Sequence, residues 1–211
     1  MTTETMTIHE ALSELKMLDK RTLDKITNAQ YCVANRHVNT KINGKTISEF
    51  SEDVKAEYQS IMDLIRRRAA IRNAVSLSNA STIITVAGKD YTVAEAIEMK
   101  NTGTQLKRNL LTEMTTSFNR ATRNVTSENE GLNRNADSYI SSLFGNKDKV
   151  NAEDINKSRN LYIEQNTMEL VDPLNAKEKI EELSASIETF NHEVDSKLSV
   201  SNALTTITIS Y

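Results

Sequence analysis

The sequence has few of the residues that interrupt regular secondary structure. Its 211 residues include five glycines and one proline. Because these two residues destabilise a helix interior most, their scarcity favours long uninterrupted helices. Tryptophan is absent, aromatic residues make up 5% of the chain and hydrophobic residues 38%, so the expected core is thin. A thin core combined with long helices predicts that part of the apolar surface is buried against another subunit.

Neither a strong charge excess nor a disulfide framework is present. The formal net charge is −3, without the basic excess expected of a protein that binds nucleic acid or an anionic membrane. The single cysteine, Cys32, cannot form an internal disulfide, which fits a reducing compartment. Residues 1–10 lack the pattern of a signal peptide, and no apolar run reaches the roughly 18 residues of a membrane span. We therefore expect a cytoplasmic protein.

Motifs for catalysis and metal binding are missing as well. Residues 44–46 (Gly-Lys-Thr) resemble the end of a phosphate-binding P-loop, but Asn39 stands where the first glycine of that motif belongs. The three histidines and Cys32 do not have the spacing of a zinc site, and no signature of a catalytic nucleophile surrounds Cys32. We predict a non-catalytic protein with no metal and no cofactor.

Three Thr-x-x-Glu sequences predict helix starts, at Thr7, Thr46 and Thr92. In this capping box the threonine hydroxyl accepts from an early helical N–H and the glutamate reaches back to the threonine. Apolar residues then recur at intervals of three and four, which predicts helices over about 7–36, over 46–78 and onward from 92.

The second half of the chain has a less regular pattern. Residues from about 123 to 151 are rich in Asn, Ser and Gly, and we expect a loop-rich insert around a short helix. Residues 152–170 predict a helix that Pro173 ends. Residues 175–198 predict another helix whose apolar positions are spaced as in a coiled coil, namely Ile180, Leu183, Ile187, Phe190, Val194 and Leu198.

An internal repeat links the two halves. Residues 76–86 (SLSNASTIITV) align with residues 199–209 (SVSNALTTITI), with seven of eleven positions identical. Each copy follows a long helix and leads into a Thr-rich strand, so the chain uses one helix, Ser-Asn-Ala, strand unit twice. The two strands are candidates to pair with each other in a small sheet.

Two interpretations of the Ser-Asn-Ala junctions remain open. In one they only stop the helices, because Asn tolerates the left-handed conformation that ends a helix and Ser satisfies free backbone groups. In the other, the two junctions form polar pockets.

A polar patch precedes the first junction. Arg68 and Arg72 are one helical turn apart beside an apolar stripe, and a guanidinium near a core either pairs with a carboxylate or receives an anion. Interhelix or intersubunit salt bridges are therefore one interpretation, and binding of a phosphate or nucleotide is the other. Nucleic acid is disfavoured, because no aromatic residues are interleaved. The candidate ligand-binding residues are Arg66, Arg68, Arg72, Asn73, Ser76, Asn79, Ser201 and Asn202.

Four segments carry a resemblance to known proteins: TIHEALSELKMLDKR, RRRAAIRNAVSLSNASTIITVAGKDYTVAEAI, LVDPL and LSVSNALTTITISY. They resemble the septicolysin-like family of small helical proteins of bacteria and their phages, and the phage versions most of all. The resemblance supplies no catalytic residues. It implies one of two binding roles: a sponge that sequesters a small nucleotide signal of host defence, or a virion part such as a neck, tail or capsid accessory protein.

Together these observations predict a mainly α protein. We expect a single domain over residues 1–211, made of long antiparallel, coiled-coil-like helices with a small β element built from the repeated unit. We expect a homo-oligomer. Its leading predicted function is non-catalytic sequestration of a small anionic, nucleotide-like ligand in the host cytoplasm, and the alternative is a structural or assembly role in the virion.

Overall fold

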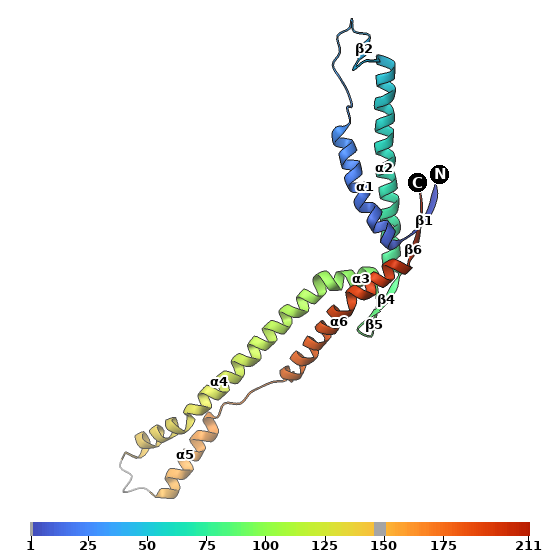
Figure 1. Ribbon diagram of the computed structural model, residues 1–211. Helices are drawn as coiled ribbons and strands as arrows, with labels where there is room; N and C mark the ends of the chain where they lie inside the picture. The colour runs from blue at the N-terminus through green and yellow to red at the C-terminus, as the bar shows by residue number, and fades with distance from the viewer. Residues whose placement is uncertain (1, 146–150) are drawn as a thin grey trace. The chain divides into compact units, whose positions relative to one another are not determined.

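Of the residues that the structure describes, 74% are helical, which confirms the mainly α prediction (Figure 1). The computed structural model describes residues 2–145 and 151–211. Their elements are β1 (Thr3–Thr7), α1 (Ile8–Asn28), β2 (Lys41–Ile42), β3 (Lys45–Thr46), α2 (Ile47–Ser81), β4 (Ile83–Val86), β5 (Lys89–Thr92), α3 (Val93–Glu98), the π-helix η1 (Met99–Gly103), α4 (Thr104–Phe144), α5 (Ala152–Asn166), α6 (Ala176–Leu204) and β6 (Thr206–Ser210).

Contacts within the chain form two compact units. The first comprises Met1–Asn101 and Phe190–Tyr211, and the second Thr102–Thr189. The sequence predicted one domain over the same residues. All eight predicted ligand-binding residues belong to the first unit.

The three predicted capping boxes are all present. At Thr7, Thr46 and Thr92 the threonine Oγ1 accepts from the backbone N–H of the glutamate three residues later, and that glutamate accepts from the threonine N–H. These hydrogen bonds from the threonine backbone hold the pKa of Glu10, Glu49 and Glu95 below its ordinary value. The first helix ends at Asn28, earlier than predicted, and the second at Ser81, later than predicted.

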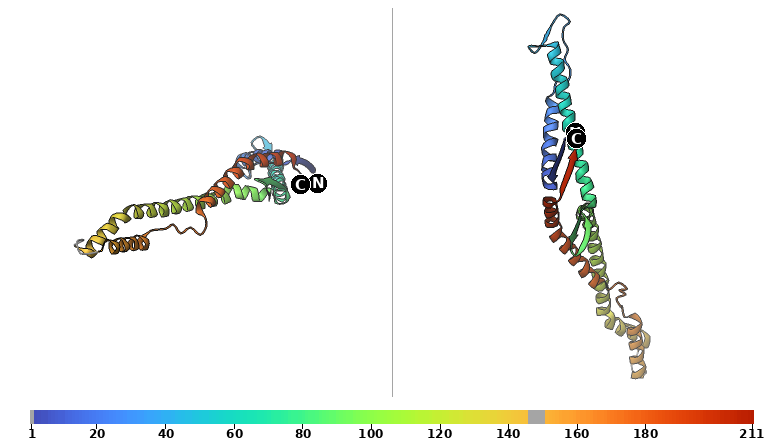
Figure 2. Two further views of the ribbon diagram at one scale, coloured as in Figure 1. Left: turned by 90° about the horizontal axis from the view of Figure 1, so that it is seen from below. Right: turned by 90° about the vertical axis from the view of Figure 1, so that its right-hand side faces the viewer.

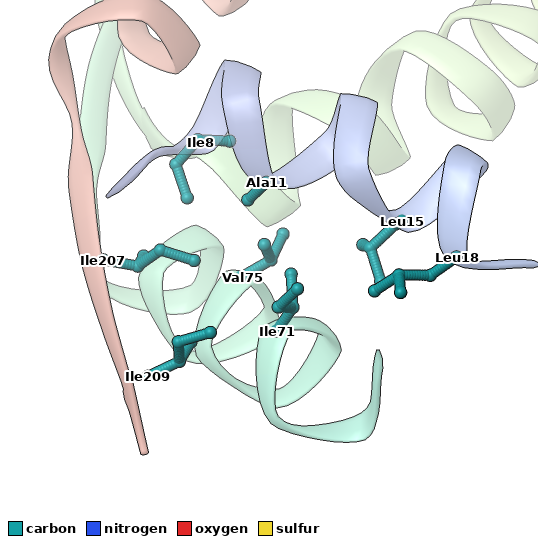
Figure 3. Packing of buried hydrophobic residues seen from close by; sticks show 8 residues of the cluster. All are labelled: Ile8, Ala11, Leu15, Leu18, Ile71, Val75, Ile207 and Ile209. Carbon is teal, nitrogen blue, oxygen red and sulfur yellow. The ribbon is translucent and has the colours of Figure 1, made fainter. Parts of the chain in front are cut away.

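In the first unit, α1 packs beside α2 and β6 to form the larger core (Figure 3). Buried residues of α1 recur at helical spacing and meet α2 on one side and the inward face of β6 on the other. The core consists of Ile8, Ala11, Leu15, Leu18, Ile71, Val75, Ile207 and Ile209. Figure 3 shows the β6 isoleucines pointing toward Val75 and Ile71.

A smaller core lies around the β4–β5 pair. Val86, Ala96, Phe190 and Val194 are buried there, and the Tyr91 ring meets the Phe190 ring edge-on with centroids 5.8 Å apart. The buried positions of α6 confirm the predicted coiled-coil-like stripe, since Phe190 and Val194 belong to it.

The strand pairing differs from the prediction. The two repeated strands do not pair with each other: β4 pairs with β5, and β6 pairs with β1, both antiparallel. β4 and β5 are joined by Ala87 and Gly88, whose φ angles of 51° and 72° suit a two-residue hairpin turn. Each repeated strand therefore has its own partner, and β4 takes the one beside it in sequence.

The helix ends at the Ser-Asn-Ala motifs also differ from the prediction. Both motifs lie inside the last helical turn, and neither asparagine is left-handed. Instead the N–H of Thr82 donates to the Ser78 carbonyl (2.8 Å) and the N–H of Thr205 to the Ser201 carbonyl (2.9 Å). A threonine rather than a left-handed asparagine follows each helix, and Thr82 has extended backbone angles.

The repeat extends further in space than in sequence. Val93 donates its backbone N–H to the Thr82 carbonyl and Ile8 to the Thr205 carbonyl, both at 2.9 Å. Thr92 faces Ile83 across one pair of strands, and Thr7 faces Thr206 across the other. Each copy is thus a helix end, a strand pair and a capped helix start, and both copies lie in the first unit (Figure 2).

The second unit is built on α4 and α5, and it corrects the predicted loop-rich insert. Residues 123–144 are helical, because the apolar spacing continues through Ala136 and Ile140, which are buried, while Asn and Ser occupy the exposed face. The Tyr139 and Tyr162 rings stack between the two helices with centroids 4.7 Å apart. The part of that prediction that covers residues 146–150 lies outside the described residues.

Candidate functional site

The predicted Arg patch lies along α2, but its residues do not share one face. Because a helix turns by about 100° per residue, Arg66 and Asn73 lie on roughly the opposite side from Arg68, Arg72 and Asn79. Between Arg66 and Asn79 the helix also rises by about 20 Å. The patch is therefore too spread out to form one compact pocket.

Two of the three arginines in the patch form ion pairs within the chain. Arg66 pairs with Asp63 at 3.2 Å, one turn away on the same helix. Arg68 pairs with Asp19 of α1. The hydrogen bond from Arg68 lowers the pKa of Asp19 below its ordinary value, and the charge of Arg72 adds to that effect. Arg68 and Arg72 thus act together on one carboxylate, as the salt-bridge interpretation predicts.

The remaining predicted residues lie at the ends of α2 and α6. Ser76 and Asn79 occupy the last turns of α2, and Ser201 and Asn202 the last turn of α6. Ser78, next to Asn79, hydrogen-bonds the Thr82 hydroxyl at 3.3 Å. The junctions thus have a structural role, and the four cavities described below include none of the eight predicted residues.

The patch prediction omitted the arginine with the most contacts. The Arg67 guanidinium donates to Glu14 (2.5 Å), to Glu4 (2.7 Å) and to the Tyr211 hydroxyl, and it lies 4.8 Å from the centre of the Tyr211 ring. These hydrogen bonds, Glu14 first, raise the pKa of Arg67 above its ordinary value, and the bond from Arg67 lowers that of Glu4. Arg67 joins α2 to α1, to β1 and to Tyr211, the residue that follows β6.

The identity of the residues alone did not distinguish Arg67 from its neighbours. It stands in the middle of the Arg66-Arg67-Arg68 run, and two of its partners lie near opposite ends of the chain. The apolar period places Arg67 close to the core side of α2, at 19% side-chain exposure. That period could have separated it from Arg66, whose side chain is 59% exposed.

Two cavities lie in the first unit. One, of about 480 Å³, is formed by the end of α1, the β2–β3 turn and the start of α2, with Asp24, Asn28, Ile42, Phe50 and Glu57 among its lining residues. The other, of about 720 Å³, is a groove whose lining carries three carboxylates, Glu4, Glu10 and Glu14, and two guanidinium groups, Arg21 and Arg67. Arg67 is already paired with Glu4 and Glu14, so the groove offers an anionic ligand little net positive charge.

Two smaller cavities lie in the second unit. One, of about 220 Å³, separates Met114 and Phe118 of α4 from residues 170–176. The other, of about 300 Å³, lies along the exposed side of α4 at Arg120 and Arg123.

Among the residues that the structure describes, no three or more His, Cys, Asp and Glu side chains are grouped closely enough to hold a metal ion. Within the same residues, no helix is both long and apolar enough to cross a membrane.

Comparisons with known proteins add no assignment. No protein-family model, no curated protein and no solved structure matches the chain.

Proposed function

We propose that the protein is a non-catalytic assembly protein that associates with further copies of itself through apolar faces of its long helices. The observation that carries this proposal is the apolar face of α4. Leu106 and Leu110 lie one turn apart on it, with 64% and 54% of their surface exposed. Exposed leucines that continue a helical stripe are typical of an interface between helices.

Two further apolar side chains, Met114 and Phe118, follow Leu110 at intervals of four. Because each such step turns about 40° round the helix, they lie beside the leucine face, where they line the 220 Å³ cavity. Val171 and Leu174, on the far side of that cavity, are 87% and 65% exposed. A second helix packed over Leu106 and Leu110 would bury these two exposed leucines, each contributing about 1 kcal/mol or more.

The experiment tests the face with matched charges. The double variant Leu106→Glu/Leu110→Glu places two carboxylates on the apolar face. The control, Gln105→Glu/Asn109→Glu, places the same charges at the same spacing on the polar side, where Gln105 donates to Asn109 at 3.0 Å. By light scattering after size-exclusion chromatography, we expect an oligomer for the wild type and the control, and a smaller species for the leucine variant. A monomeric wild type contradicts the proposal.

The resemblance to phage proteins makes the proposal more specific. An assembly protein of a phage would be part of the particle or of its assembly intermediates. Sedimentation of lysates from infected cells checks this: the protein should travel with particles or their precursors. Recovery only at the top of the gradient contradicts a virion role while leaving self-association in place.

Sequestration of an anionic ligand is the second candidate function. The observation in its favour is that Arg68 and Arg72 act on a single carboxylate, Asp19, which leaves one positive charge in excess. The Asp19 side chain is half exposed, so a phosphate could displace it.

Native mass spectrometry after gentle purification from cells with active defence signalling tests sequestration, followed by titration with ADP as a probe. An added mass in the nucleotide range supports sequestration if the double variant Arg68→Ala/Arg72→Ala loses it and the control variant Arg66→Ala retains it. An unliganded protein that does not bind ADP opposes it.

A further inference from the structure

The 480 Å³ cavity at the end of the α1–α2 pair has the size and composition of a small-molecule site. Part of its lining is apolar: Ile42 is buried, and Phe50 and Val54 are half-buried. Asn28, Gln30 and Asn43 add amide groups to the lining. Pockets that combine apolar side chains with a few polar groups are typical of sites that orient a small ligand.

Both lysines of the cavity are already neutralised. Lys25 Nζ lies 3.1 Å from Glu57 and donates to Ser60 Oγ at 3.0 Å, and Lys45 Nζ lies 2.5 Å from Asp53. These pairs also tie α1 and the β2–β3 turn to α2, so they hold the walls of the cavity together.

One negative charge is left over. The lining carries three carboxylates and two ammonium groups, and after the two pairs the remaining charge is that of Asp24. No partner of the Asp24 carboxylate is found among residues 2–145 and 151–211.

The end of α1 adds to this potential. Lys25 and Asn28 belong to its last turn and Ala29 is its C-cap, where the helix dipole is negative, and Asp24 directly precedes that turn. The charge and the dipole therefore both favour a cation in the cavity.

We propose that this cavity binds a small organic amine. Its ammonium group would donate to the Asp24 carboxylate near the α1 carboxyl end, and its hydrocarbon part would lie on Phe50 and Val54. The inference does not depend on the proposed assembly role, because the cavity lies on the first unit and the α4 face on the second.

Three probes with one carbon skeleton separate charge from hydrophobicity: butylamine, 1-butanol and butyrate. Each is titrated into the full chain at fixed pH and ionic strength, while NMR records the amide shifts of residues 24–57. We expect saturable shifts with butylamine. The affinity for 1-butanol should be at least about tenfold weaker, and butyrate should cause no shifts. Equal binding of all three probes, or no saturation with butylamine, overturns the proposal.

Two matched variants test the role of Asp24. Asp24→Asn keeps the shape of the exposed side chain and removes its charge, so butylamine affinity should fall about tenfold. Glu52→Gln removes the same charge next to Asp53 on α2 but outside the cavity lining, and should leave the affinity unchanged. If both variants lose affinity equally, the effect comes from the overall charge and the site is wrong. Circular dichroism of each variant confirms that the helices are intact.

Discussion

The two strand pairs of the first unit have the same register but are closed in different ways. In the β4–β5 pair a two-residue turn joins the strands, and the Ala87 N–H donates to Glu193 at 2.8 Å. In the β1–β6 pair the strands come from opposite ends of the chain, and the Arg67 guanidinium contacts Glu4 of β1 and Tyr211, which follows β6. A covalent turn closes the first pair locally, whereas the second depends on contacts between residues far apart in sequence.

The side chains across the strands are correspondingly different. Thr85 donates to Asp90 at 2.6 Å in the hairpin, while Thr5 and Thr208 share a hydrogen bond of 3.1 Å at the equivalent place of the terminal pair. The two copies thus share their backbone register and their helix caps. They differ in the tertiary contacts that hold each pair of strands in place. Four predictions use this difference.

The largest effect is expected from the two cores. Ile71→Ala empties part of the core under β6, where Ile71 is fully buried, and should lower the free energy of unfolding by about 3 kcal/mol. Val194→Ala in the core under the hairpin removes fewer atoms and should cost about 2 kcal/mol. Urea denaturation measures both. A smaller effect at Ile71 than at Val194 would contradict the ranking of the two cores.

The next effect concerns the residue that closes the terminal pair. Arg67→Ala leaves Glu4 and Glu14 without their cation and should cost about 2 kcal/mol, since these pairs are partly buried. Hydrogen exchange should accelerate in β1 and β6 and stay unchanged in β4 and β5. The matched variant Glu193→Gln should affect only the hairpin and by less. Uniform acceleration in both pairs would show that they open together.

The hairpin turn gives a smaller effect. Gly88 has a φ of +72° and open space around a built Cβ, so Gly88→Ala should cost about 1 kcal/mol through backbone strain alone. Ala87→Gly relieves a non-glycine residue at φ 51° and should cost less or stabilise. Thermal unfolding measures the pair of variants. Neither change should alter exchange in β1 and β6.

The smallest effect is on pH dependence. The bond from Arg67 lowers the pKa of Glu4 in the folded chain, so its carboxylate stabilises the fold above its unfolded pKa, and this contribution is lost as pH falls through the folded pKa. Acidification from neutral pH should therefore accelerate exchange in β1–β6 more in the wild type than in the Glu4→Gln variant, which lacks this carboxylate. Exchange rates in β1 that respond to acid equally in wild type and variant would remove Glu4 as the cause.

Local signals in the sequence predicted the local features well. All three capping boxes and the alternation of Ile207 and Ile209 follow from short-range rules, and the structure confirms them. The predicted loop-rich insert after residue 123 was wrong for residues 123–144. The prediction followed the Asn-rich composition, whereas the helix follows the apolar spacing that continues to Ile140. Propensity is a weak prior when one face of a helix is covered.

Long-range partners account for the rest. Which strand pairs with which is decided by contacts between residues about 200 positions apart, and no pattern within residues 76–86 contains that information. For the same reason the three consecutive arginines looked alike. The partner of Arg66, Asp63, lies three residues away on the same helix. The partners of Arg67 and Arg68, namely Glu4, Glu14 and Asp19, come from distant parts of the sequence and are brought to α2 only by the fold.

The pairing of Thr2 with Tyr211, whose backbone N–H groups each donate to the other's carbonyl at 3.1 and 3.3 Å, has a consequence for engineering. A short peptide linker between these residues would turn the backbone into a ring without displacing either strand. The bond between Ala87 and Gly88 is the equivalent place in the other copy, so that ring could be cut there. The resulting circular permutant would begin at β5 and end at β4, with every strand still beside its present neighbour.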